Sequence, residues 1–191
     1  MLDLIKKMTT IEITTDRIKL RLIELSDLES IHQLLSLPET DEYNVLGIPK
    51  DIKETESIIK PWIAENNLNE IRNYTFAIED QLNKKFIGLF GLKLGTKKYK
   101  RGEVWYKIHV DFWNKGYATE SLKAILSFGF ETLKLHRMEA GCAVENIGSI
   151  KVLEKVGMVR EGRKRQTLPL KTGWSDNFEY SILETDERKI M

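Results

Sequence analysis

Three strand-like segments follow one another in the middle of the chain, and this run constrains the fold more than any other feature. They are Tyr74–Ile78, Phe86–Leu94 and Glu103–Val110, separated by a turn at Asp80–Asn83 and by a lysine-rich loop. Consecutive strands joined by short turns form an antiparallel meander. The sequence therefore predicts antiparallel sheet at its centre, with a bulge near Gly88 in the long second strand.

Helical and strand patterns precede this meander. Arg17–Leu22 alternates polar and apolar residues, as a half-buried strand does. Ser26–Glu29 is a capping-box pattern that predicts the start of a helix. Asp51–Asn67 predicts a second helix, in which Pro61 should cause a kink or a break.

After the meander, helices and strands alternate. The predicted elements are a helix ending near Leu133, a strand Arg137–Val144, a helix Asn146–Val156 closed by Gly157, and strands Met158–Arg160 and Phe178–Leu183. This order predicts an α/β (α+β) fold with a mixed, mostly antiparallel sheet of about seven strands flanked by about four helices. No linker composition appears, so we expect a single domain over 1–191.

Composition excludes several classes of protein. The formal net charge is +1, which gives no global field that would select nucleic acid or a membrane. The single cysteine, Cys142, fits a reducing compartment. Met1–Lys7 is not a signal peptide, and no run approaches the ~20 apolar residues that span a bilayer. We expect a cytoplasmic protein without a metal site, because no His/Cys/Asp cluster has ligand spacing.

A loop between the last strand of the meander and the next helix is the first candidate site. It reads Asn114-Lys115-Gly116-Tyr117-Ala118-Thr119. The first amides of a helix lack intrahelical acceptors and attract anions, and Gly116 permits a phosphate to approach the backbone closely. A plain strand-to-helix turn has the same residues, so phosphate binding stays one of two interpretations. No P-loop or G-x-G-x-x-G motif competes with it.

The chain resembles the GNAT superfamily of acetyl-CoA-dependent N-acetyltransferases, and within it the Rim-type branch that acetylates ribosomal-protein N-termini. Four stretches carry the resemblance, in family order and with family spacing. They are Thr15–Arg21, Gly102–Tyr106, Trp113–Glu120, and Asn146–Ser149 followed by Val152–Met158.

The resemblance implies acetyl-CoA as cosubstrate, bound where the fourth and fifth strands splay apart. Pantetheine would contact the backbone of Ile108, His109 and Val110, and Asn146 would hydrogen-bond the pantetheine arm. The pyrophosphate would lie on the amides of the loop residues Asn114, Lys115, Gly116, Tyr117, Ala118 and Thr119. Ser149, close to Asn146 on the same helix, would belong to the same site.

Two positions depart from the family pattern. Trp113 replaces a common Gln or Arg and marks the Rim-like branch. Leu153 stands where many members have a tyrosine that acts as general acid, so that proton-donating role must move to another group or to water.

Catalytic candidates follow from the chemistry of amide formation, which needs a neutral amine and a proton for the leaving thiolate. Glu103 is the predicted base and Ser149 the predicted acid. The competing interpretation of Glu103 is a solvated charge at a strand edge, and that of the segment holding Ser149 is helix capping, for which Asn146 is a good N-cap. His109 is a weaker candidate base. Cys142 is expected in the core and not as a nucleophile.

The acceptor amine is left open by the sequence. A protein N-terminus is the first hypothesis, because an α-amino group has a pKa of about 8 and needs only a weak base. A small amine such as a polyamine, amino acid or aminoglycoside is the alternative, and a non-catalytic acetyl-CoA-binding module is a third. The resemblance also leaves room for a homodimer and for contact with the ribosome, and basic runs such as Lys97–Arg101 could meet RNA.

Overall fold

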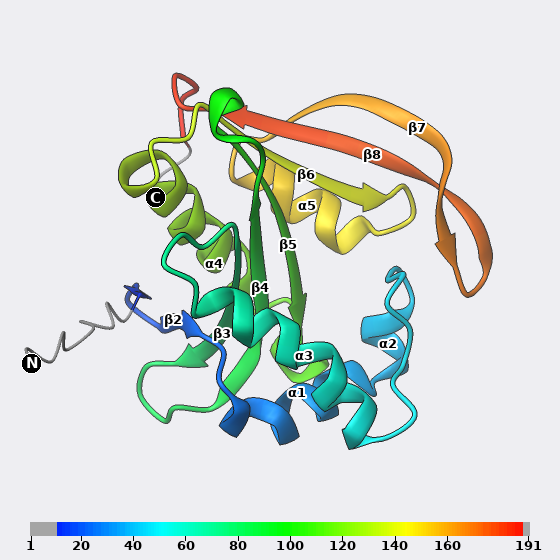
Figure 1. The fold of residues 1–191 in the computed structure, drawn as a ribbon. Helices are drawn as coiled ribbons and strands as arrows, with labels where there is room; N and C mark the ends of the chain where they lie inside the picture. Colours follow the sequence, from blue (N-terminus) through cyan, green and yellow to red (C-terminus); the bar gives the residue numbers. More distant parts are fainter. Residues whose placement is uncertain (1–10, 189–191) are drawn as a thin grey trace, which may run out of the picture.

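A single eight-stranded sheet organises the chain in the computed structural model, which describes residues 11–188 (Figure 1). The strand order is β1-β2-β3-β4-β5-β6-β8-β7. The strands are β1 (Glu12–Thr14), β2 (Ile18–Leu22), β3 (Asn73–Asp80), β4 (Phe86–Leu94), β5 (Arg101–Ile108), β6 (Arg137–Ala143), β7 (Val159–Leu170) and β8 (Gly173–Leu183). The Met1–Lys7 segment lies outside the described residues.

The splayed pair of strands is confirmed at β5 and β6. Strands β3 to β5 form the predicted antiparallel meander, to which β2 adds a further antiparallel strand, and β5 pairs with β4 along its length. With β6, in contrast, β5 pairs in parallel only from Arg101 to Val104, opposite Arg137 to Ala140. Beyond Val104 the two strands part, so the second half of β5 has a free edge.

Helices cover both faces of the sheet. The longer helices are α1 (Leu28–Leu35), α3 (Ile52–Asn66), α4 (Tyr117–Ser127) and α5 (Ile147–Lys155), with a short α2 at Pro38–Asp41 and a π-helical turn at Phe128–Thr132. Successive residues of a strand point to opposite faces, and two separate cores result. Phe90 packs with residues of α4 and α5, whereas Leu89 packs with residues of α1 and α3.

Glycines in β4 let β5 approach closely. A Cβ atom on Gly88 would lie 2.2 Å from the carbonyl oxygen of Lys107. The predicted irregularity is present here, because the register of β3 against β4 shifts between Ile78 and Glu79. The free half of β5 is thus held tightly on its β4 side.

Several boundaries differ from those predicted. The capping box forms two residues earlier, with Glu24 and Asp27, so its assignment to Ser26–Glu29 was wrong. Pro61 does not break α3. Strand β7 continues to Leu170 and β8 begins at Gly173, so both strands are longer than predicted. The first strand of this hairpin is almost entirely exposed and shows no apolar alternation, because it is stabilised by pairing with β8.

Candidate functional site

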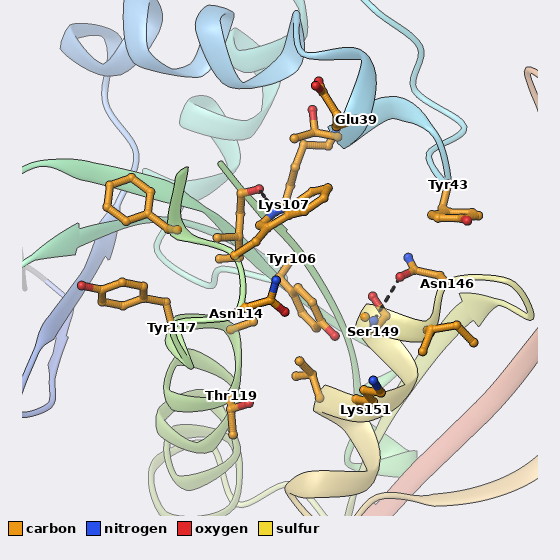
Figure 2. A pocket seen from close by; sticks show the side chains of 18 of the residues that line it. Glu39, Tyr43, Tyr106, Lys107, Asn114, Tyr117, Thr119, Asn146, Ser149 and Lys151 are labelled. Atoms are coloured by element: carbon orange, nitrogen blue, oxygen red, sulfur yellow. Dashed lines mark hydrogen bonds between the residues drawn. The ribbon is translucent and has the colours of Figure 1, made fainter. Parts of the chain in front are cut away.

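A cavity of about 650 Å³ opens where β5 leaves β6 (Figure 2). Its walls come from the end of β5, the starts of α4 and α5, and α2 with the loop that follows it. The lining residues are Glu39, Thr40, Glu42, Tyr43, Asn44, Tyr106, Lys107, Ile108, Phe112, Trp113, Asn114, Gly116, Tyr117, Ala118, Thr119, Glu145, Asn146, Ile147, Gly148, Ser149, Lys151, Val152 and Lys155. This volume lies within the range of small-ligand sites.

The predicted anion loop forms one end of the cavity. Gly116 is the N-cap of α4 with φ +83°, a left-handed conformation that favours glycine, and it provides no capping side chain. The amides of Tyr117, Ala118 and Thr119 have no intrahelical acceptors, because they belong to the first turn. Unpaired donors and the positive end of the helix dipole therefore meet at the cavity wall.

Arg17 stabilises this loop through an ion pair and a hydrogen bond, a role that the sequence analysis did not assign. Its Nη2 lies 2.5 Å from Oε2 of Glu120, and its Nη1 donates to the carbonyl oxygen of Lys115 at 3.1 Å. Burial raises the pKa of Glu120, but hydrogen bonds from Thr15 and Arg17 outweigh it, and the net pKa is lowered. The Thr15–Arg21 stretch thus contributes to the site by fixing the α4 turn.

The start of α5 forms the facing wall. Asn146 is the N-cap, and its Oδ1 accepts a hydrogen bond of 3.0 Å from the backbone amide of Ser149. The capping role predicted for Asn146 is confirmed. Lys151 and Lys155 add two cations to this wall, which the sequence analysis did not single out.

Tyr106 reaches from β5 toward Ser149 (Figure 2). Its hydroxyl is shielded from solvent and has no hydrogen-bond partner among the described residues. Burial raises the pKa of Tyr106, and the nearby Ser149 hydroxyl opposes this only in part. The phenol therefore stays protonated, with a free O–H to donate. Leu153, where a tyrosine is common, is buried in the core.

Lys107, the next residue of β5, is buried on the opposite face of the strand. The residue is 6 % exposed, and its Nζ has no hydrogen-bond partner in the described part of the chain. Burial lowers its pKa to about 8, with Asp41 of α2 acting in the opposite direction. Asp41 is also 6 % exposed, and its Oδ1 is likewise without a partner. Sequence reasoning missed this pair, because Lys107 looked like one polar residue in a strand.

Four predicted site residues do not line the cavity. They are Glu103, His109, Val110 and Lys115. Glu103 is exposed in the part of β5 that still pairs with β6, opposite Glu139. It lies four residues from Lys107, roughly 13 Å along a strand. Its assignment as the base stays a prediction.

The backbone predicted to hold pantetheine is already hydrogen-bonded within the protein. The carbonyl oxygen of Ile108 accepts from Trp113 Nε1 at 2.7 Å, and the amide of His109 donates to Ile87 at 2.9 Å. The hydrogen bond from Trp113 therefore holds the loop before α4 against the end of β5. The carbonyl oxygens retain a second lone pair for another donor.

The remaining candidates have structural explanations. Cys142 is buried in the core, and burial raises the pKa of its thiol to about 11, which leaves it unreactive. Among residues 11–188, no group of His, Cys, Asp and Glu side chains could hold a metal ion. No helix in this part of the chain is long and apolar enough to cross a membrane.

Comparison with known proteins places the chain in a family. A family model described as "Acetyltransferase (GNAT) domain" matches residues 17–159. The uncharacterized N-acetyltransferase YnaD of Bacillus subtilis is 32% identical over 176 residues, which cover 91% of this chain and 98% of YnaD.

Two solved structures have the same fold. A GNAT-family acetyltransferase from Bacillus anthracis superposes with a TM-score of 0.81 at 28% identity, covering 92% of this chain and 100% of the other. Spermidine N-acetyltransferase from Vibrio cholerae, solved with CoA and spermine, has a TM-score of 0.79 at 25% identity, covering 90% and 98%. The chain therefore belongs to the GNAT acetyltransferase family and is an acetyl-CoA-dependent N-acetyltransferase.

Proposed function

We propose that this protein transfers the acetyl group of acetyl-CoA directly to a primary amine, and that the first acceptor to test is the N-terminal amine of a protein such as a ribosomal protein. The observation that carries the proposal is the cavity at the parting of β5 and β6, with a free helix N-terminus at one wall and an acidic rim at another. An anionic cosubstrate and a cationic acceptor can thus enter from different sides.

The cosubstrate half of the site is assigned to α4 and α5. The amides from Asn114 to Thr119 would bind the pyrophosphate, and Lys151 and Lys155 would neutralise phosphate charge across the gap. Asn146, already fixed as a helix cap, would contact the pantetheine arm with its amide group. The backbone of Ile108, His109 and Val110 would hold the same arm from β5.

Proton donation to the leaving thiolate is assigned to Ser149, with Tyr106 beside it. Ser149 is held by the Asn146 cap, so its hydroxyl stays at the cavity wall. Tyr106 supplies a second, permanently protonated O–H to the same place. Two converging hydroxyls would compensate for Leu153, which has no proton to give.

The acceptor half is assigned to α2 and the tip of the β7–β8 hairpin. Glu39, Glu42 and Glu145 line the cavity there. A second hollow of about 300 Å³ shares Glu42 and Glu145 with it, and its hairpin lining residues are Leu170, Thr172, Gly173, Trp174 and Ser175. The shared residues make the two hollows neighbours, which favours an extended acceptor such as a peptide.

A polyamine is the second candidate acceptor, because the same rim is acidic. Three carboxylates around the mouth attract a polycation in preference to a neutral amine. The likeness to a spermidine N-acetyltransferase solved with spermine supports this candidate.

A thiol-release assay tests the proposal. Purified protein with acetyl-CoA would be offered N-terminal peptides, polyamines, amino acids and aminoglycosides, with mass spectrometry of the products. We expect one class to be acetylated at a primary amine. Tight acetyl-CoA binding without turnover on any acceptor would instead identify a non-catalytic binding module, and no binding at all would refute the assignment of the cavity.

A further inference from the structure

Two oppositely charged buried groups, one on β5 and one at the end of α2, have polar atoms without hydrogen-bond partners in the described residues and act on each other through their charges. Lys107 on β5 lines the cavity, yet its Nζ is shielded from solvent and makes no hydrogen bond. Asp41 at the end of α2 is equally buried and has a free Oδ1. Asp41 acts on Lys107 through its charge, although no ion pair of 4.0 Å or less joins the two side chains among residues 11–188.

Such an arrangement is costly, because burying an ammonium without hydrogen bonds disfavours its charged form. Buried polar groups in native structures are nearly always paired, and those that are not concentrate at functional sites. Lys107 lies between Glu39 and Asn114 in Figure 2, which is between the acceptor wall and the anion loop.

The reaction requires a base within reach of the acceptor amine in the cavity. An acceptor amine arrives as an ammonium and cannot attack the thioester until it loses a proton. Glu103, the base suggested by the family pattern, does not line the cavity. The charged groups that face Lys107 from neighbouring elements or across the cavity are Glu39, Asp41, Glu42, Glu145, Lys151 and Lys155.

We propose that Lys107 accepts the proton of the acceptor ammonium and that Asp41 stabilises the lysine ammonium that results. The inference rests on the proposed acetyl transfer to a primary amine. Because Nζ has no hydrogen bond to break, rotation of the lysine side chain can expose it to the cavity that Lys107 already lines. It then stands on the face of β5 opposite to Tyr106, so proton acceptor and proton donors lie on different sides of the strand.

The proton balance is complete without a further reactant. Neutral Lys107 takes one proton from the acceptor ammonium. The neutral amine forms a C–N bond to the thioester carbon, and the C–S bond breaks. The leaving thiolate takes a proton from the Ser149 or Tyr106 hydroxyl, and the second proton of the nitrogen replaces it. Lys107 returns its proton to solvent, so one proton is released for each acetyl group transferred. A lysine with a pKa of about 8 is matched to this cycle near neutral pH.

The steady-state kinetics of Lys107→Met and Lys107→Arg provide the first test. Lys93→Met, at an exposed position on the adjacent strand, is the control, and Glu103→Gln tests the competing candidate base. We expect both Lys107 variants to lose 10²- to 10⁴-fold in kcat/KM, the usual range for a general base. Acetyl-CoA affinity should stay within about twofold of the wild type, because the base does not touch the cosubstrate.

A weakly basic acceptor separates catalysis from structure. An analogue of the acetylated amine with fluorines beside the nitrogen has a pKa low enough to arrive neutral. With it, the loss in Lys107→Met should shrink to less than about tenfold, since no proton has to be removed first. A loss of equal size with both amines, or a basicity-dependent loss in Glu103→Gln instead, would overturn the proposal.

Trace labelling with acetic anhydride tests Lys107 without any acceptor, because the anhydride acylates only neutral amines and does not itself titrate. Mass spectrometry of the folded protein should show that modification of Lys107 levels off above about pH 8.5, whereas a reference lysine peptide still gains rate toward its ordinary pKa of about 10.4. A Lys107 profile that follows the reference peptide would overturn the proposal, whether or not the wild type acetylates any amine. Absence of turnover with a levelling profile would refute only the proposed function.

Discussion

Replacing Lys107 with methionine should make the protein more stable at neutral pH, although it removes a charged residue from a functional site. Methionine matches the length of the lysine stem and has no charge to desolvate. Folding lowers the pKa of Lys107 from the ordinary 10.5 to about 8. At about 1.4 kcal/mol per tenfold change in proton affinity, this difference corresponds to roughly 3 kcal/mol that opposes folding below pH 8.

The net gain in the free energy of unfolding of Lys107→Met should be smaller, about 1 to 2 kcal/mol, because Asp41 loses its neighbouring cation in the variant. For a chain of this length, each 1 kcal/mol shifts the melting temperature by about 2–4 °C. The direction in which stability changes with pH follows from proton binding. Between pH 8 and 10.5 the unfolded chain holds a proton on this lysine that the folded chain has released, so wild-type stability rises with pH there.

Urea unfolding of the wild type and of Lys107→Met, from pH 7 to pH 9.5, measures this effect. The stability advantage of the variant should be largest at pH 7 and fall by roughly half or more at pH 9.5, as the wild-type penalty disappears. Lys93→Met, at an exposed position, should stay within about 0.5 kcal/mol of the wild type throughout. A variant that is less stable at pH 7, or an advantage that does not depend on pH, would refute the reasoning.

Further predictions concern the two walls of the cavity. Gly116→Ala should cost about 1 kcal/mol of stability and weaken CoA binding at least tenfold by calorimetry, whereas Gly47→Ala, at a similar φ of +80° with open space around it, should cost stability alone. Arg17→Ala should weaken CoA binding by about tenfold in the same experiment, because the α4 turn loses its support. Ser149→Ala should lower kcat by at least about tenfold with unchanged CoA affinity, and full activity would reject it as the acid. Tyr106→Phe should lower kcat without changing the melting temperature by more than about 2 °C, since its hydroxyl has no partner to lose.

Local sequence patterns predict an element correctly where a single structural rule determines it. The meander, the helix after Gly116 and the Asn146 cap follow from alternation, from a glycine before a helix and from a capping residue, and all three are present. The splay of β5 from β6 was implied by family resemblance and is confirmed by pairing that ends at Val104.

Long-range contacts were not predictable in the same way. The β7–β8 hairpin has an exposed, polar first strand, so its length depends on cross-strand pairing that no periodicity reports. Asp41 and Lys107 are 66 positions apart, and each resembles a surface residue in isolation. Only the fold buries both and shows that neither has a hydrogen-bond partner.

The parting of β5 from β6 also explains why the chemistry can be divided between adjacent residues. Inside a sheet, consecutive side chains point into different cores, and neither core admits a ligand. Once β5 has a free edge beyond Val104, Tyr106 and Lys107 still point to opposite faces, but both now border a single cavity. The phenol faces the helix that would hold the leaving thiol, and the lysine faces the wall through which an amine would enter. Moving either residue by one position would place its side chain on the wrong face, so an insertion between Val104 and Lys107 should abolish turnover even if the sheet still forms.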